Sequence, residues 1–98
     1  MNIATEALAT PDMYRLLVGG VTPRPIAWIS TVSEGGVHNI APYSFFSVAS
    51  VTPPVLSYTQ VNPRTGSDKD TLRNLLHNQE CVVHIVNSAS LEKMNQSC

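Results

Sequence analysis

Residues 23–42 read PRPIAWISTVSEGGVHNIAP, and this stretch decides the fold of the chain. Its first prolines favour extended backbone, and residues 26–32 are rich in the β-branched and aromatic side chains that are typical of a strand. The glycine pair at 35–36 favours a tight turn into a second strand over 37–40. We expect Ala41-Pro42 to interrupt that strand, because proline cannot donate a hydrogen bond to a sheet ladder. The stretch therefore predicts an antiparallel hairpin.

The flanking sequence predicts three further strands, over residues 44–51, 55–61 and 81–87. Four strands thus follow one another through short turns, and the fifth comes after a helix. This order favours an antiparallel meander or barrel over a doubly wound parallel sheet, whose strands would alternate with helices. The expected fold class is mostly β, with short flanking helices.

Three short helices are expected. The first has Thr10 as its cap and is stopped by the glycine pair at 19–20. The second covers 70–80, with Asp70 as its N-cap and an apolar stripe made by Leu72, Leu75 and Leu76. The third starts after a serine cap, at position 88 or 90.

Composition excludes several classes of protein. The 98 residues allow one domain, and 43% hydrophobic against 13% charged residues is too apolar for a disordered chain. A net charge of -1 argues against a nucleic-acid partner, and the apolar runs are too short to span a membrane. The N-terminus lacks the pattern of a signal peptide, and two cysteines are too few for a disulfide framework. We therefore expect a cytoplasmic protein.

The segment before the second helix is the first candidate for chemistry. Arg64, Lys69 and Arg73 are three of the six basic residues of the chain, and Thr71 adds a hydroxyl at a helix start. Cationic side chains, hydroxyls and free backbone N–H groups suit a phosphate. The alternative is a solvated loop with ordinary capping by Asp70. Neither a P-loop nor a GxGxxG motif is present.

The second candidate is NIAPYSFFSVAS, residues 39–50, where serine and alanine stand at many positions of a predicted strand. Small residues allow a flat ligand to approach the backbone, although a tightly packed strand crossing would have the same composition. The three histidines have no metal-ligand spacing, and no GxSxG motif marks a nucleophile. The side chains offer no self-sufficient catalytic set, so an enzyme of this sequence would depend on a cofactor.

Four stretches together resemble the flavin reductase-like family of FMN-binding split-barrel proteins, which includes the flavoredoxins. They are RLLVGGVTPRPIAWIST at 15–31, NIAPYSFFSVASVTPP at 39–54, KDTLRNL at 69–75 and CVVHIVN at 81–87. The resemblance runs from about Met13 to Met94. Members of this family are roughly twice as long, so it implies that residues 1–98 are the N-terminal part of a single, apparently truncated domain. It also implies an antiparallel, Greek-key-like split β-barrel that forms a homodimer, with FMN near the subunit interface.

The resemblance also implies a set of FMN-binding residues. Near the ribityl-phosphate it places Ser30 and Thr31. Along the isoalloxazine it places Asn39, Ala41, Pro42, Tyr43 and Ser44, followed by Phe45, Ser47 and Val48. At the phosphate it places Arg64, Lys69 and Thr71, with Asp70 capping the helix behind.

By this resemblance the protein is expected to be a flavin reductase-type oxidoreductase. Electrons would pass from NAD(P)H or a protein donor through FMN to flavin or another acceptor, with no catalytic side chain required. One alternative is a non-catalytic flavin-binding or structural dimerisation module, such as a truncated, inactive member of the family. Another is a β-domain that binds a different phosphorylated ligand.

Overall fold

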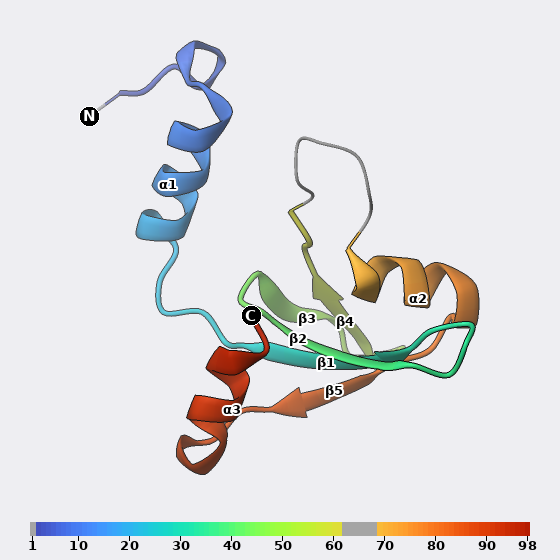
Figure 1. Ribbon diagram of the computed structural model, residues 1–98. Helices are drawn as coiled ribbons and strands as arrows, with labels where there is room; N and C mark the ends of the chain where they lie inside the picture. Colours follow the sequence, from blue (N-terminus) through green and yellow to red (C-terminus); the bar gives the residue numbers. More distant parts are fainter. Residues whose placement is uncertain (1, 62–68) are drawn as a thin grey trace.

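The computed structural model describes residues 2–61 and 69–98, and these form two small antiparallel sheets with three α-helices (Figure 1). The elements in chain order are η1 (Thr5–Ala7), α1 (Thr10–Gly20), β1 (Ala27–Val32), β2 (His38–Tyr43), β3 (Phe46–Ser50), β4 (Val55–Tyr58), α2 (Asp70–Asn78), β5 (Val82–Ile85), η2 (Ser88–Ser90) and α3 (Leu91–Gln96). The predicted class, mostly β with antiparallel pairing and short flanking helices, is confirmed. No helix among the described residues is both long and apolar enough to cross a membrane.

Of the two arrangements that the sequence favours, a meander or a barrel, a single meander is not formed. The first sheet has the order β2-β1-β5, and the second contains only β3 and β4. The β4–β5 connection contains α2, and this longer connection allows β5 to return to β1 instead of pairing with β4. The predicted break at Pro42 is also wrong, since β2 continues through this residue, which lies opposite Trp28. Strand β2 is an edge strand of the described sheet. A proline in an edge strand removes no hydrogen bond between the strands when its nitrogen faces away from the neighbouring strand, here β1.

A small core forms on one face of β1. Ala27 and Ile29 are buried with Tyr43, and Phe46 and Tyr58 of the second sheet pack against them. The Tyr43 and Tyr58 rings lie 4.9 Å apart between centroids and link the two sheets. Burial raises the pKa of Tyr58, and the neighbouring Tyr43 and Cys81 add to this effect. The core therefore joins both sheets at the residues that lead into the bend between β2 and β3.

The starts of α1 and α2 differ from the expected ones, whereas Ser90 lies in the cap position of α3, as predicted. Helix α1 begins at Thr10 with Ala9 in the cap position, so Thr10 is not the cap, but it ends as predicted at the glycine pair, with Gly20 as its last residue. Helix α2 begins at Asp70 with Lys69 in the cap position, so Asp70 is not the cap and its carboxylate pairs with Arg73 instead. At the third helix the side chains of Asn87 and Ser90 form a reciprocal capping box around η2.

The expected leucine stripe of α2 is only partly buried. Leu72 and Leu75 are half-buried and Leu76 is 67% exposed, whereas the fully buried residues of the helix, Thr71 and Asn74, are polar. The helix lies on the same side of β1 as Thr31, and α3 contacts the opposite side, where the Trp28 indole donates a hydrogen bond to Ser97. Buried polar side chains need hydrogen-bond partners, so α2 must be held by specific contacts.

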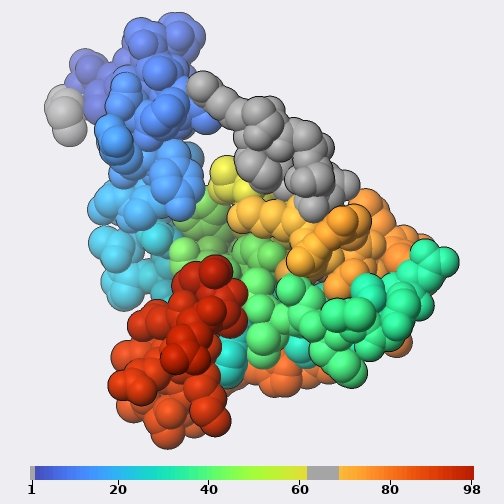
Figure 2. All heavy atoms as spheres, viewed as in Figure 1, coloured from blue at the N-terminus to red at the C-terminus, as the bar shows by residue number. Residues whose placement is uncertain are grey.

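Helix α1 stands to one side of the sheets and buries none of its residues (Figures 1 and 2). The radius of gyration is 15.5 Å, larger than the value of about 13 Å expected for a compact chain of this length. The protruding helix contributes to this extended shape.

Candidate functional site

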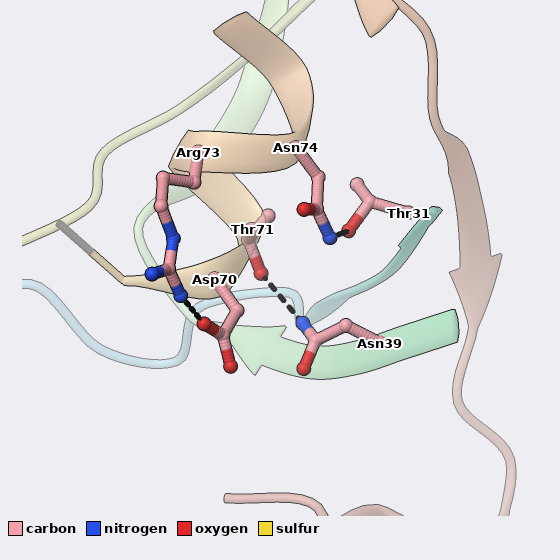
Figure 3. A network of polar contacts seen from close by, with 6 residues as sticks. All are labelled: Thr31, Asn39, Asp70, Thr71, Arg73 and Asn74. Carbon is pink, nitrogen blue, oxygen red and sulfur yellow. Dashed lines mark hydrogen bonds and ion pairs between the residues drawn. The ribbon is translucent and has the colours of Figure 1, made fainter. Parts of the chain in front are cut away.

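Two hydrogen bonds hold the start of α2 against the first sheet (Figure 3). The Asn74 amide donates to Thr31 Oγ1 on β1 at 2.9 Å, and the Asn39 amide on β2 donates to Thr71 Oγ1 at 3.2 Å. Thr31, Thr71 and Asn74 are all buried, so these bonds are shielded from water. The first two turns of α2 are therefore fixed relative to the N-terminal end of β2 and the C-terminal end of β1.

This anchoring places Lys69, in the cap position of α2, beside the bend that follows β2. Its ammonium nitrogen lies 6.0 Å from the centroid of the Tyr43 ring. Here the surface contains a hollow of about 160 Å³, which we call the aromatic groove; its lining residues are Tyr14, Pro42, Tyr43, Ser44, Phe45, Thr59, Val61 and Lys69. Among the described residues no carboxylate forms a salt bridge with Lys69.

The chemistry of the aromatic groove suits a planar ligand with an anionic group. Three aromatic rings, those of Tyr14, Tyr43 and Phe45, offer flat apolar surface, and Ser44 offers a hydroxyl. Lys69 adds a positive charge next to the first turn of α2, whose free N–H groups also favour negative charge. No cluster of potential metal ligands exists in the described part of the chain.

One wall of the aromatic groove comes from α1. The Tyr14 ring lies 6.1 Å from that of Phe45, inclined by 57°. The Arg24 guanidinium lies over the Phe45 ring, 5.3 Å from its centroid. The same guanidinium donates hydrogen bonds to the backbone carbonyl of Val18, at 2.8 Å, and to that of Val21. Tyr14 and Arg24 are not among the predicted site residues, because nothing in their local sequence pattern indicates that they meet Phe45.

Nine of the predicted site residues line the aromatic groove or one of two other hollows. Pro42, Tyr43, Ser44, Phe45 and Lys69 line the aromatic groove. Asn39 and Asp70 line a polar hollow of about 480 Å³ between the β1–β2 turn and α2. Ser30 and Thr31 line another, of about 350 Å³, at the end of β1. The contact between Asn39 and Thr71 joins the β2 part of the predicted set to the α2 part.

Other predicted residues lie elsewhere or have other contacts. Ala41 packs against the core, while Ser47 and Val48 are exposed on β3. Ser30 points away from Thr31, and its hydroxyl lies 2.9 Å from the His84 ring on β5. Thr71 uses its buried hydroxyl to accept the hydrogen bond from Asn39, and Arg64 lies outside the described residues. Their contacts with a cofactor stay predictions.

Comparison with known proteins identifies the family of this chain. Residues 18–97 match the family model described as the flavin reductase like domain. The chain belongs to this family. The resemblance found in the sequence motifs is therefore confirmed.

Relatives of the chain come from several bacteria. The chain is 47% identical over 92 residues to the uncharacterized protein YwrF of Bacillus subtilis, a match that covers 94% of the chain and 44% of YwrF. It is 46% identical over 94 residues to an uncharacterized protein of Aquifex aeolicus, with 96% and 48% covered. The chain thus spans about half the length of the curated relatives it matches.

Two solved structures share the fold. Nitrilotriacetate monooxygenase component B from Bacillus cereus matches with a TM-score of 0.90 and 36% identity, over 99% of this chain and 48% of that protein. The 2-nitrobenzoate 2-nitroreductase NbaA of Pseudomonas fluorescens matches with a TM-score of 0.83 and 33% identity, over 97% and 45%. The flavin reductase-type fold of this chain is therefore established.

Proposed function

We propose that this chain binds FMN in the aromatic groove and is part of a flavin reductase-type oxidoreductase. The observation that carries the proposal is the meeting of Lys69, Tyr43 and Ser44 in one groove, at a helix start that Asn39 and Thr71 tie to the sheet. A cation next to flat aromatic surface matches an aromatic ring system with a phosphate tail. Membership of the flavin reductase-like family supports the same cofactor class.

Under this proposal the residues of the groove divide the binding between them. Lys69 and the N–H groups of the first turn of α2 hold the phosphate, and Tyr43, Ser44 and Phe45 contact the ring system. FMN, when bound, supplies the transfer of electrons between donor and acceptor. The chain orients the cofactor and excludes water from one side of it. NAD(P)H is the proposed small-molecule donor, and flavin or another small molecule the acceptor.

The size of the groove supports a site shared with further protein. Cofactor pockets usually enclose about 300–1,000 Å³, whereas the aromatic groove measures about 160 Å³. We propose that a homodimer completes the enclosure, with FMN near the interface of the two copies.

The test is a titration of the purified protein with FMN, in which quenching of the flavin fluorescence measures binding. We expect saturable binding that Lys69→Ala weakens by about ten- to a hundredfold, because one charge-assisted contact is lost. Lys93→Ala is the matched control, since this lysine is exposed on α3 far along the chain from the groove. Equal FMN affinity of Lys69→Ala and wild type would contradict the phosphate assignment.

A second measurement separates the enzyme from a flavin-binding module without turnover. The FMN-loaded protein is mixed with NADH or NADPH and free flavin, and the absorbance of the reduced nicotinamide is followed. Consumption above the rate of free flavin alone supports the oxidoreductase. Flavin binding without consumption of either nucleotide supports the non-catalytic module.

A further inference from the structure

Tyr14 is the residue of α1 that lines the aromatic groove. The helix buries none of its side chains, and Tyr14 itself is 48% exposed. An aromatic ring that leaves half its surface open beside another ring offers a flat contact for a third. The helix otherwise stands away from the sheets, so this contact is not explained by packing of a core (Figure 1).

Arg24 holds α1 in the position that brings Tyr14 to the groove. Its guanidinium donates to carbonyls at the C-terminal end of the helix and just beyond, those of Val18 and Val21. The same group lies over the Phe45 ring, where its charge is attracted to the π-electrons. A positive charge is also favourable at a helix C-terminus. One side chain therefore connects the end of α1 to the ring that Tyr14 faces.

We infer that Tyr14 is a ring-contacting residue of the flavin site and that Arg24 is its positioning residue. The inference rests on the proposed function and extends it to α1. Tyr14 contacts the planar ring system of the cofactor, on the side of the groove formed by Phe45. Lys69, in contrast, recognises the phosphate. The two residues therefore affect different parts of the same ligand.

Riboflavin and FMN separate these two roles, because riboflavin has the ring system without the phosphate. We expect Tyr14→Ala to weaken both ligands about equally, by roughly tenfold, whereas Tyr14→Phe keeps the affinity because it keeps the ring. Lys69→Ala weakens FMN and leaves riboflavin unchanged. Leu17→Ala is the control on the same helix; Leu17 is 50% exposed and is not among the groove-lining residues.

A double-mutant cycle tests the role of Arg24. If Arg24 acts by placing Tyr14, Arg24→Ala weakens both flavins, and adding it to Tyr14→Ala causes little further loss. Arg24→Lys, which keeps the charge and one donor group, restores part of the affinity. Additive losses would overturn the positioning role, because an independent effect on stability does not depend on Tyr14.

The outcomes distinguish this inference from the function on which it rests. A wild-type protein that binds neither flavin overturns both. A wild-type protein that binds FMN, together with a Tyr14→Ala variant that behaves like Leu17→Ala, overturns the inference alone. Loss of FMN binding with unchanged riboflavin binding in Tyr14→Ala also overturns it, because the contact would then be with the phosphate. Circular dichroism of each variant confirms that the helices are retained.

Discussion

Asn74 and Thr31 show how single polar residues hold the site together. Their hydrogen bond is buried, and it joins α2 to β1 where an apolar contact would be expected. A buried donor without a partner costs free energy, so each of the two side chains requires the other. The neighbouring bond from Asn39 to Thr71 repeats the arrangement on β2. These residues fix the start of α2, and with it the position of Lys69, relative to the sheet.

Thr31→Val should therefore lower the free energy of unfolding by about 1–3 kcal/mol, because it leaves the Asn74 amide buried and unpaired. Adding Asn74→Leu should cost less than the sum of the two single changes, since both partners are then apolar. Urea unfolding measures the three variants. Ser47→Ala, at an exposed position of β3, is the control. Strict additivity of the two changes would contradict the coupling.

Tyr58 provides a prediction about alkaline pH. Its pKa is raised above 10.0 by burial first, and then by Tyr43 and Cys81. The unfolded chain therefore loses the phenolic proton at a lower pH than the folded chain, and the stability of the fold falls as the pH rises above about 10. We expect the decline of Tm between pH 9 and pH 11 to be shallower in Tyr58→Phe than in wild type. Equal slopes would contradict the contribution of Tyr58.

The β1–β2 hairpin is the element that local sequence predicts best. Gly36 adopts a φ of 82° in the turn, as expected for the glycine pair, because side chains with a Cβ avoid this region. Strand β1 and the start of α2 also lie close to their predicted bounds. The pairing of β5 with β1 could not be predicted, since strand pairing depends on contacts between distant segments. The polar buried face of α2 was missed because its partners, Thr31 and Asn39, lie on other elements.

The candidate site, like the fold, could be predicted from the sequence only in part. The Lys69 segment and residues 39–50 were candidates from their chemistry, and the family resemblance implied the individual residues; the structure brings Lys69 and residues 42–45 into one groove. Tyr14 could not be predicted, because within α1 it is one of several apolar residues. Only the folded chain places it next to Phe45.

Gly36→Ala tests whether the β1–β2 turn requires a glycine at this position. A Cβ at this position meets no atom within 4 Å, so the cost comes from the positive φ alone. We expect a loss of about 1–2 kcal/mol in unfolding free energy. Gly35→Ala is the matched control in the same turn, where the new Cβ would make only an ordinary contact with Ser33. Equal effects of the two changes in urea unfolding would contradict this interpretation.

The whole molecule exposes much of its apolar surface. Val51 is 81% exposed and Ile85 is 78% exposed, and the buried core contains few residues. Large exposed apolar side chains favour association with further protein. The proposed homodimer would cover part of this surface and enclose the small aromatic groove.

We therefore expect the protein to sediment as a dimer, with twice the 10.6 kDa mass of one chain. Sedimentation equilibrium at several concentrations measures this mass. If FMN lies near the interface, added FMN should shift the equilibrium further toward the dimer. A monomer that stays monomeric with and without FMN would contradict the proposed assembly.

A crystal structure of the protein with FMN bound would show directly whether the aromatic groove holds the cofactor. We expect the phosphate within hydrogen-bond distance of the Lys69 ammonium group, with the ring system against Tyr43 and Phe45. Well-defined FMN at another place, with Lys69 free of it, would overturn the proposed site.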